Sequence, residues 1–216
     1  MVLHLARTLE VPLRSRNDLL LSSGFAPVFA SKGLDDPTLA IARRAMGFLL
    51  ERHEPFPALA IDQNWTIIET NRGMARLSTF LAAGQPRDDV KFNGVDYLGA
   101  LVDPNGFRKY MIEGETIIVA LLESALREAT TAQGKKGIER VSGYLANFDR
   151  VRVAETAPAS GPLPRVTFQR DGVRLSFVTI MTAFAAPCDA TLEEVKQELF
   201  YPADQTTQKV LTEWAA

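Results

Sequence analysis

Cysteine and histidine are scarce in the 216-residue sequence, which has one cysteine, Cys188, and two histidines, His4 and His53. A single cysteine excludes an internal disulfide framework and a multi-cysteine zinc site, and this usage agrees with a reducing compartment. A nucleophilic triad needs a histidine base beside a Ser or Cys and an acid, and neither histidine lies in such a signature. We therefore expect no catalytic residues, no metal site and a cytoplasmic location.

An excess of one charge and long apolar runs are also lacking. The 24 basic and 26 acidic residues leave a formal charge of −2, so no net field would draw the chain to a phosphate backbone. Charges interrupt the richest apolar stretch, 117–126, which is far shorter than the ~20 residues that cross a bilayer. The N-terminal residues do not resemble a signal peptide. We expect a soluble protein with no membrane partner.

Phosphate-binding and metal-binding patterns are missing as well. The glycines at 94, 99 and 106 match neither the Walker pattern nor the dinucleotide fingerprint, so no cofactor is expected. Acidic pairs occur at 35–36, 88–89 and 193–194 without histidine or carboxylate partners at metal spacing. We interpret these pairs as helix caps or solvated surface charge.

What is present is enough apolar sequence for a core, with 46% hydrophobic and 23% charged residues. Most of the first 150 residues carry helical spacing, with predicted caps at Asp35-Asp36 and Asn71 and a weak point at Gly114. The predicted helices cover 1–10, 13–23, 35–53, 71–81, 95–102, 107–131 and 138–148, with a linker at 25–33 and a strand hairpin at 58–61 and 65–70.

The last third changes to β-rich sequence, after prolines at 158, 162 and 164 that indicate a loop. Strands at 165–169 and 173–184 flank Arg170-Asp171-Gly172, a strong hairpin signal. Residues 191–200 are compatible with a helix or a strand, and we favour the strand; 203–214 predict a final helix. The pattern therefore predicts an α+β fold.

The strand 173–184 is apolar on both faces. One face would carry Val173, Leu175, Phe177, Thr179, Met181 and Ala183, and the other Val178, Ile180 and Phe184. A central strand covered on both sides explains this pattern as ordinary core, and a hydrophobic ligand cavity against one face explains it equally well. Sequence alone leaves both interpretations open.

A series of short strings, in a fixed order, is shared with one bacterial family. In the first half they are LAR at 5–7, PLRSRNDLLL at 12–21, GFAP at 24–27, LDDP at 34–37, PFPAL at 55–59, and then Asp62, Trp65 and Asn71. In the last third they are LSF at 175–177, TAF at 182–184, Pro187, Thr191-Leu192 and FYPAD at 200–204. With these strings the chain resembles the MmyB-like transcription regulators over most of its length.

The resemblance implies a fold, a domain division and partners. Residues 1–27 would be the C-terminal remnant of an Xre-type helix-turn-helix domain, and residues 28–216 a PAS-like ligand-binding domain. The expected fold is α+β: a PAS-like antiparallel sheet packed with helices, preceded by a short N-terminal helical pair. The ligand would be a fatty acid or a similar small apolar molecule. DNA would be contacted only through helices upstream of Met1.

Two functions stay open at this point. In the first, the domain is the effector-sensing part of a transcription regulator and a ligand biases two of its arrangements. In the second, it is a structural and dimerisation module with a filled core that brings two DNA-binding domains together in a homodimer. A cavity of roughly 300 Å³ or more would favour the sensor. The candidate lining residues are Trp65, Ile67, Leu121, Leu122, Phe177, Thr179 and Met181.

Overall fold

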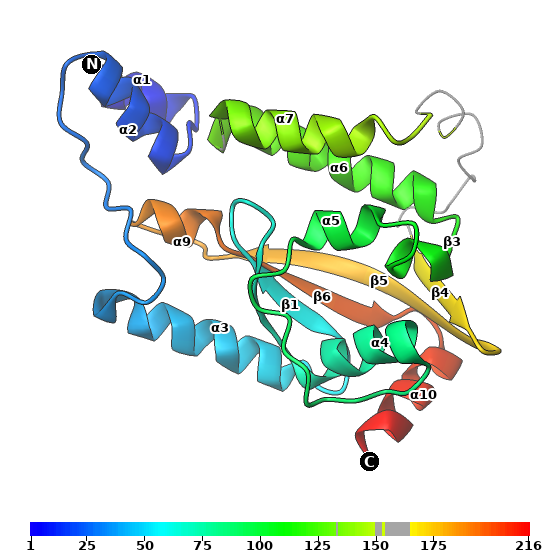
Figure 1. Ribbon diagram of the computed structural model, residues 1–216. Helices are drawn as coiled ribbons and strands as arrows, with labels where there is room; N and C mark the ends of the chain where they lie inside the picture. Colours follow the sequence, from blue (N-terminus) through cyan, green and yellow to red (C-terminus); the bar gives the residue numbers. More distant parts are fainter. Residues whose placement is uncertain (133, 150–152, 154–164) are drawn as a thin grey trace.

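The protein is built around a six-stranded antiparallel sheet (Figure 1). Its structure is a computed structural model that describes residues 1–132, 134–149, 153 and 165–216. The strand order is β2-β1-β6-β5-β4-β3, so the last strand of the chain lies beside the first. The strands are β1 (Ala58–Ile61), β2 (Ile67–Thr70), β3 (Met111–Ile112), β4 (Val166–Arg170), β5 (Val173–Ala183) and β6 (Lys196–Pro202).

Helices precede the sheet, join its strands and cover both of its faces. They are α1 (Val2–Thr8), α2 (Leu13–Ser22), η1 (Pro37–Leu39), α3 (Ala40–Arg52), α4 (Arg72–Ala83), α5 (Tyr97–Val102), η2 (Phe107–Tyr110), α6 (Gly114–Ala132), α7 (Gly134–Leu145), α9 (Ala190–Glu194) and α10 (Gln205–Ala215). The predicted α+β class, with an antiparallel sheet, covering helices and an N-terminal helical pair, is confirmed.

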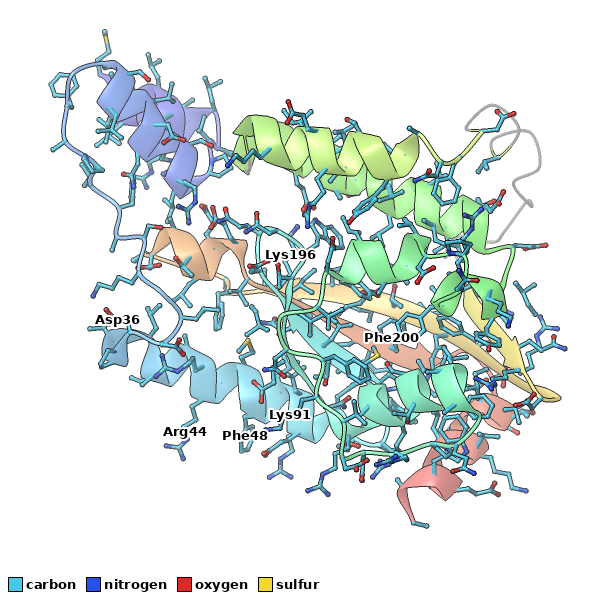
Figure 2. All side chains as sticks on the ribbon, viewed as in Figure 1. Asp36, Arg44, Phe48, Lys91, Lys196 and Phe200 are labelled. Carbon is cyan, nitrogen blue, oxygen red and sulfur yellow. The ribbon has the colours of Figure 1, made fainter. Side chains whose placement is uncertain are left out.

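The two faces of the sheet belong to two hydrophobic clusters. Alternate residues of β1 separate them: Leu59 and Ile61 join the large cluster under α4, α5, α6 and α7, while Ala58 and Ala60 join a small cluster with α3. Because both clusters exclude water, β1 is buried on both faces, as the all-apolar string 58–61 indicates. In Figure 2, Arg44 and Phe48 project outward from α3, and Phe48 is 56% exposed.

Asn71 holds three elements together. Its buried Oδ1 accepts bonds from the backbone N–H of Met74 (2.9 Å), which caps α4, and of Ala58 (2.9 Å), where β1 begins. Its Nδ2 donates to the carbonyl oxygens of Phe56 (2.8 Å) and Leu50 (3.2 Å), at the end of α3. One amide side chain therefore uses all its hydrogen-bonding capacity to fix the junction of α3, β1 and α4.

The first residue of β2 and the residues just before it pair with the segment 94–97, which leads into α5. The amide of Ile67 donates to Val95 O (2.9 Å), and the amide of Gly94 donates to Ile67 O (2.7 Å). The amide of Tyr97 donates to Trp65 O (2.9 Å). These bonds fix the start of α5 relative to the sheet, and with it the Tyr97 side chain.

The N-terminal pair, α1 and α2, is attached to the sheet domain through α9. Arg14 of α2 forms a bidentate ion pair with Glu194, with Nε–Oε1 at 2.7 Å and Nη2–Oε2 at 2.9 Å, and the amide of Leu13 donates to Glu193 (2.5 Å). Glu194 is buried, so the interpretation of 193–194 as solvated surface charge is wrong. The proposed domain boundary between residues 27 and 28 stays a prediction.

Two elements of the structure differ from those predicted. The long helix predicted over 107–131 is divided, because Met111 and Ile112 pair with Phe168 and Thr167 as strand β3, and Glu113 has a positive φ of 53° before α6 begins. Residues 191–200 are partly helix, α9, and partly strand, β6. The other described helices and strands are confirmed to within a few residues. The predicted proline loop at 158–164 lies outside the described residues.

Candidate functional site

A cavity of about 320 Å³ lies between the sheet and the helices over one of its faces. Strands β4, β5 and β6 form one wall, α4, α5 and α6 form the opposite wall, and η2 and β3 contribute at one side (Figure 1). The volume lies within the range of small-molecule pockets. The lining residues are Met74, Leu77, Ser78, Leu81, Tyr97, Leu101, Phe107, Met111, Thr116, Ile117, Ile118, Ala120, Leu121, Ser124, Val166, Phe168, Thr179, Glu198 and Phe200.

The apolar lining is interrupted by a small polar cluster on the sheet side. Glu198 of β6 is 6% exposed, and its Oε2 accepts a hydrogen bond of 2.8 Å from the hydroxyl of Tyr97. Thr179 of the neighbouring strand β5 also lines the cavity, and its hydroxyl group favours the ionised form of the Glu198 carboxyl group. Tyr97 in turn stacks on Trp65, with ring centroids 6.4 Å apart. The cavity is therefore amphipathic, with one carboxyl group at a defined place.

Burial shifts the ionisation of this cluster. Loss of hydration raises the pKa of Glu198 from 4.5 to about 7, and the hydroxyl groups of Tyr97 and Thr179 oppose this rise without cancelling it. Burial beside the Glu198 carboxyl group also raises the pKa of Tyr97 well above its ordinary value. The cluster thus holds a carboxyl group that is costly to ionise, and a hydrogen-bond donor from a ligand would reduce that cost.

The seven candidate residues from the sequence fall into three groups. Leu121 of α6 and Thr179 of β5 line the cavity. Four others are buried in the large cluster around it without lining it: Trp65, Ile67, Leu122 and Phe177. The register pairs Met181 with Glu198, so Met181 shares the expected face of β5, but its side chain is 41% exposed and lies outside the lining. Whether these residues bind a ligand stays a prediction.

Sequence reasoning missed Glu198 and Tyr97. The signal for Glu198 was weak, because it follows Lys196 and Gln197 and the three residues together resemble an ordinary exposed polar stretch. The helical spacing of Leu192, Val195 and Leu199 in the same segment obscured it. Tyr97 had no comparable signal, since its role depends on a strand a hundred residues later.

The histidines and the cysteine lie away from the cavity. His53 ends α3, where its Nε2 lies 3.0 Å from Phe200 O, and burial lowers its pKa. Cys188 is exposed. Within the part of the chain that the structure describes, no three His, Cys, Asp or Glu side chains come together as metal ligands would. No helix among the described residues combines the length and apolar character needed to span a membrane.

Strand β6 joins the cavity to the attachment of the N-terminal pair. Glu194, which binds Arg14, lies at the end of α9, and Glu198 follows four residues later on β6. Between them, the Lys196 ammonium pairs with Glu128 of α6 (2.5 Å) and lies 5.5 Å from the Trp65 ring centroid. Figure 2 shows Lys196 and Phe200 at separate points along the sheet. A displacement of β6 at the cavity would therefore reach α9 over a short backbone distance.

Comparison with known proteins identifies the kind of domain that carries this cavity. A family model described as the MmyB-like transcription regulator ligand binding domain matches residues 42–213. The match includes every strand of the sheet and every element that lines the cavity. No curated protein matches the sequence.

Proposed function

Because the chain belongs to the MmyB-like transcription regulator ligand-binding domain family, we propose that it senses a small, largely apolar effector in the cavity between the sheet and α4, α5 and α6. The effector would be fatty-acid-like in its extended apolar body. The observation that carries this proposal is the cavity of about 320 Å³ with its mainly apolar lining. A filled core, as in a purely structural dimerisation module, would have been packed without such a volume.

The regulatory output would run through the N-terminal pair. Ligand binding can shift an equilibrium only if the two arrangements of the domain bind the ligand with different affinities. Strand β6 offers such a difference, since it lines the cavity at Glu198 and continues from the α9 segment that binds Arg14. We infer that a ligand in the cavity changes the position of α1 and α2 relative to the sheet domain. In a homodimer, this change would alter how the DNA-binding domains joined to these helices are oriented on the operator.

The test is native mass spectrometry of the purified chain, followed by denaturing extraction and lipid analysis. A stoichiometric amphiphile, or a rise in melting temperature when amphiphiles are added to the stripped protein, supports the sensor. A protein that carries no small molecule and gains no stability from any added amphiphile refutes it and favours the dimerisation module.

A matched pair of substitutions locates the binding in the cavity. Ser124→Leu extends a side chain of α6 into the cavity, so amphiphile affinity should fall at least about tenfold while the fold is kept. Ser142→Leu makes the same change on an exposed position of α7 and should leave affinity unchanged. Equal effects of the two substitutions would place the binding elsewhere.

A further inference from the structure

The polar cluster in the cavity restricts the head group of the effector. The Tyr97 hydroxyl group donates its hydrogen to Glu198 Oε2, so this donor is already used, and the Thr179 hydroxyl group favours the ionised form of the same carboxyl group. What the cluster offers to a ligand is therefore acceptor capacity: the lone pairs of the two hydroxyl oxygens and the remaining lone pairs of the carboxylate. A ligand that lies against this cluster has to supply the hydrogen.

The charges around the cavity point the same way. Glu198 is the acidic side chain of the lining, and no Lys, Arg or His of the described residues lines the cavity. The cation nearest to it along β6, Lys196, is paired with Glu128 and covers the Trp65 ring. Above pH 7, where the Glu198 carboxyl group is ionised, a ligand carboxylate placed beside it would meet a like charge in an apolar surrounding, without a cation to neutralise either group.

We propose that the effector carries a hydrogen-bond donor, such as a hydroxyl, amide or amine, at one end of its apolar body and that Glu198 receives this donor. The inference rests on the proposed sensor function and specifies its ligand: an acyl or alkyl chain that ends in a donor, in place of a free fatty acid. The raised pKa of Glu198 supports it, since a ligand donor would replace the hydration that the carboxylate lost on burial.

The test compares three probes with the same ten-carbon chain: 1-decanol, decylamine and decanoate. Binding to the stripped protein is measured by calorimetry at pH 8, below the micelle concentration of each probe. Decanol and decylamine should bind at least about tenfold more tightly than decanoate, the difference expected for one hydrogen bond to a charged acceptor. Decanoate that binds as tightly as the two donor probes overturns the inference.

Two Glu→Gln variants assign the preference to this carboxylate. Glu198→Gln keeps the shape but removes the charge and adds a donor, so decanoate should gain affinity, decylamine should lose it, and the preference should largely disappear. Glu194→Gln is the matched control, because Glu194 is also buried but binds Arg14 outside the cavity. A preference that survives in Glu198→Gln overturns the inference.

The two proposals fail in different ways. If decanoate binds best, the cavity is a ligand site and only the head-group inference is wrong. If none of the three probes binds, the sensor function fails and the head-group inference falls with it.

Discussion

Replacing the buried Glu198 carboxyl group should change how stability depends on pH. The pKa of Glu198 is about 7 in the folded protein, against 4.5 for an ordinary Glu. Well below pH 4.5 the Glu198 carboxyl group is protonated in both the folded and the unfolded state, so it does not lower the free energy of unfolding. As the pH rises, the unfolded chain loses this proton first. Folding stability therefore falls until the pH passes 7, by about 3 kcal/mol in total.

Glu198→Gln lacks this titration, so its stability relative to the native sequence should rise with pH. Most of the effect, about 2.5 kcal/mol, should develop between pH 5 and pH 8.5, and the difference should level off above pH 8. The measurement is urea denaturation of both stripped proteins across this range, because the difference between them cancels the titration of all other groups. A difference that stays constant within about 1 kcal/mol would refute the description of Glu198 as a desolvated carboxyl group.

Three further predictions concern packing and the attachment of the helical pair. Asn71→Ala should lower the free energy of unfolding by about 3 kcal/mol in urea denaturation, because it removes a cap and leaves buried backbone groups unpaired. Gly73→Ala should destabilise the fold by about 1–3 kcal/mol, since a Cβ there would lie 2.6 Å from two carbonyl oxygens. Gly47→Ala in α3 meets open space and should stabilise the fold by about 0.5–1 kcal/mol. If both variants melted at the temperature of the native protein, both predictions would be wrong. Arg14→Met should leave Glu194 without its ion-pair partner and speed amide hydrogen exchange in α2 at least about tenfold, with protection of the sheet unchanged.

The local elements could be predicted because their signals lie within a few residues of each other. Asn71 shows this: a capping residue between two short apolar strand segments and an apolar helical stripe is enough to place β1, β2 and α4. The Asp171-Gly172 turn, where both residues have positive φ, likewise places β4 and β5.

The elements that were missed depend on partners far along the chain. Strand β3 has two residues and exists because Met111 and Ile112 meet β4, more than fifty residues later. Gly114 was a recognisable weak point, yet nothing local distinguishes a glycine inside a helix from one that begins it. The cavity is a volume left among four strands and four helical segments, and no single segment encodes a volume. For the same reason the sequence could name an apolar face of β5 but could not separate Thr179, at the cavity, from Phe177, in the core.

The short and covered margins of the sheet limit how copies of this domain can associate. An open strand edge is a template onto which another chain can add by backbone pairing. Here one margin, β2, is already paired at its first residue, Ile67, with the segment 94–97, and the other, β3, is two residues long. Strand addition therefore has only short edges to extend among the described residues, and side-chain contacts would have to supply most of any association between copies of this domain.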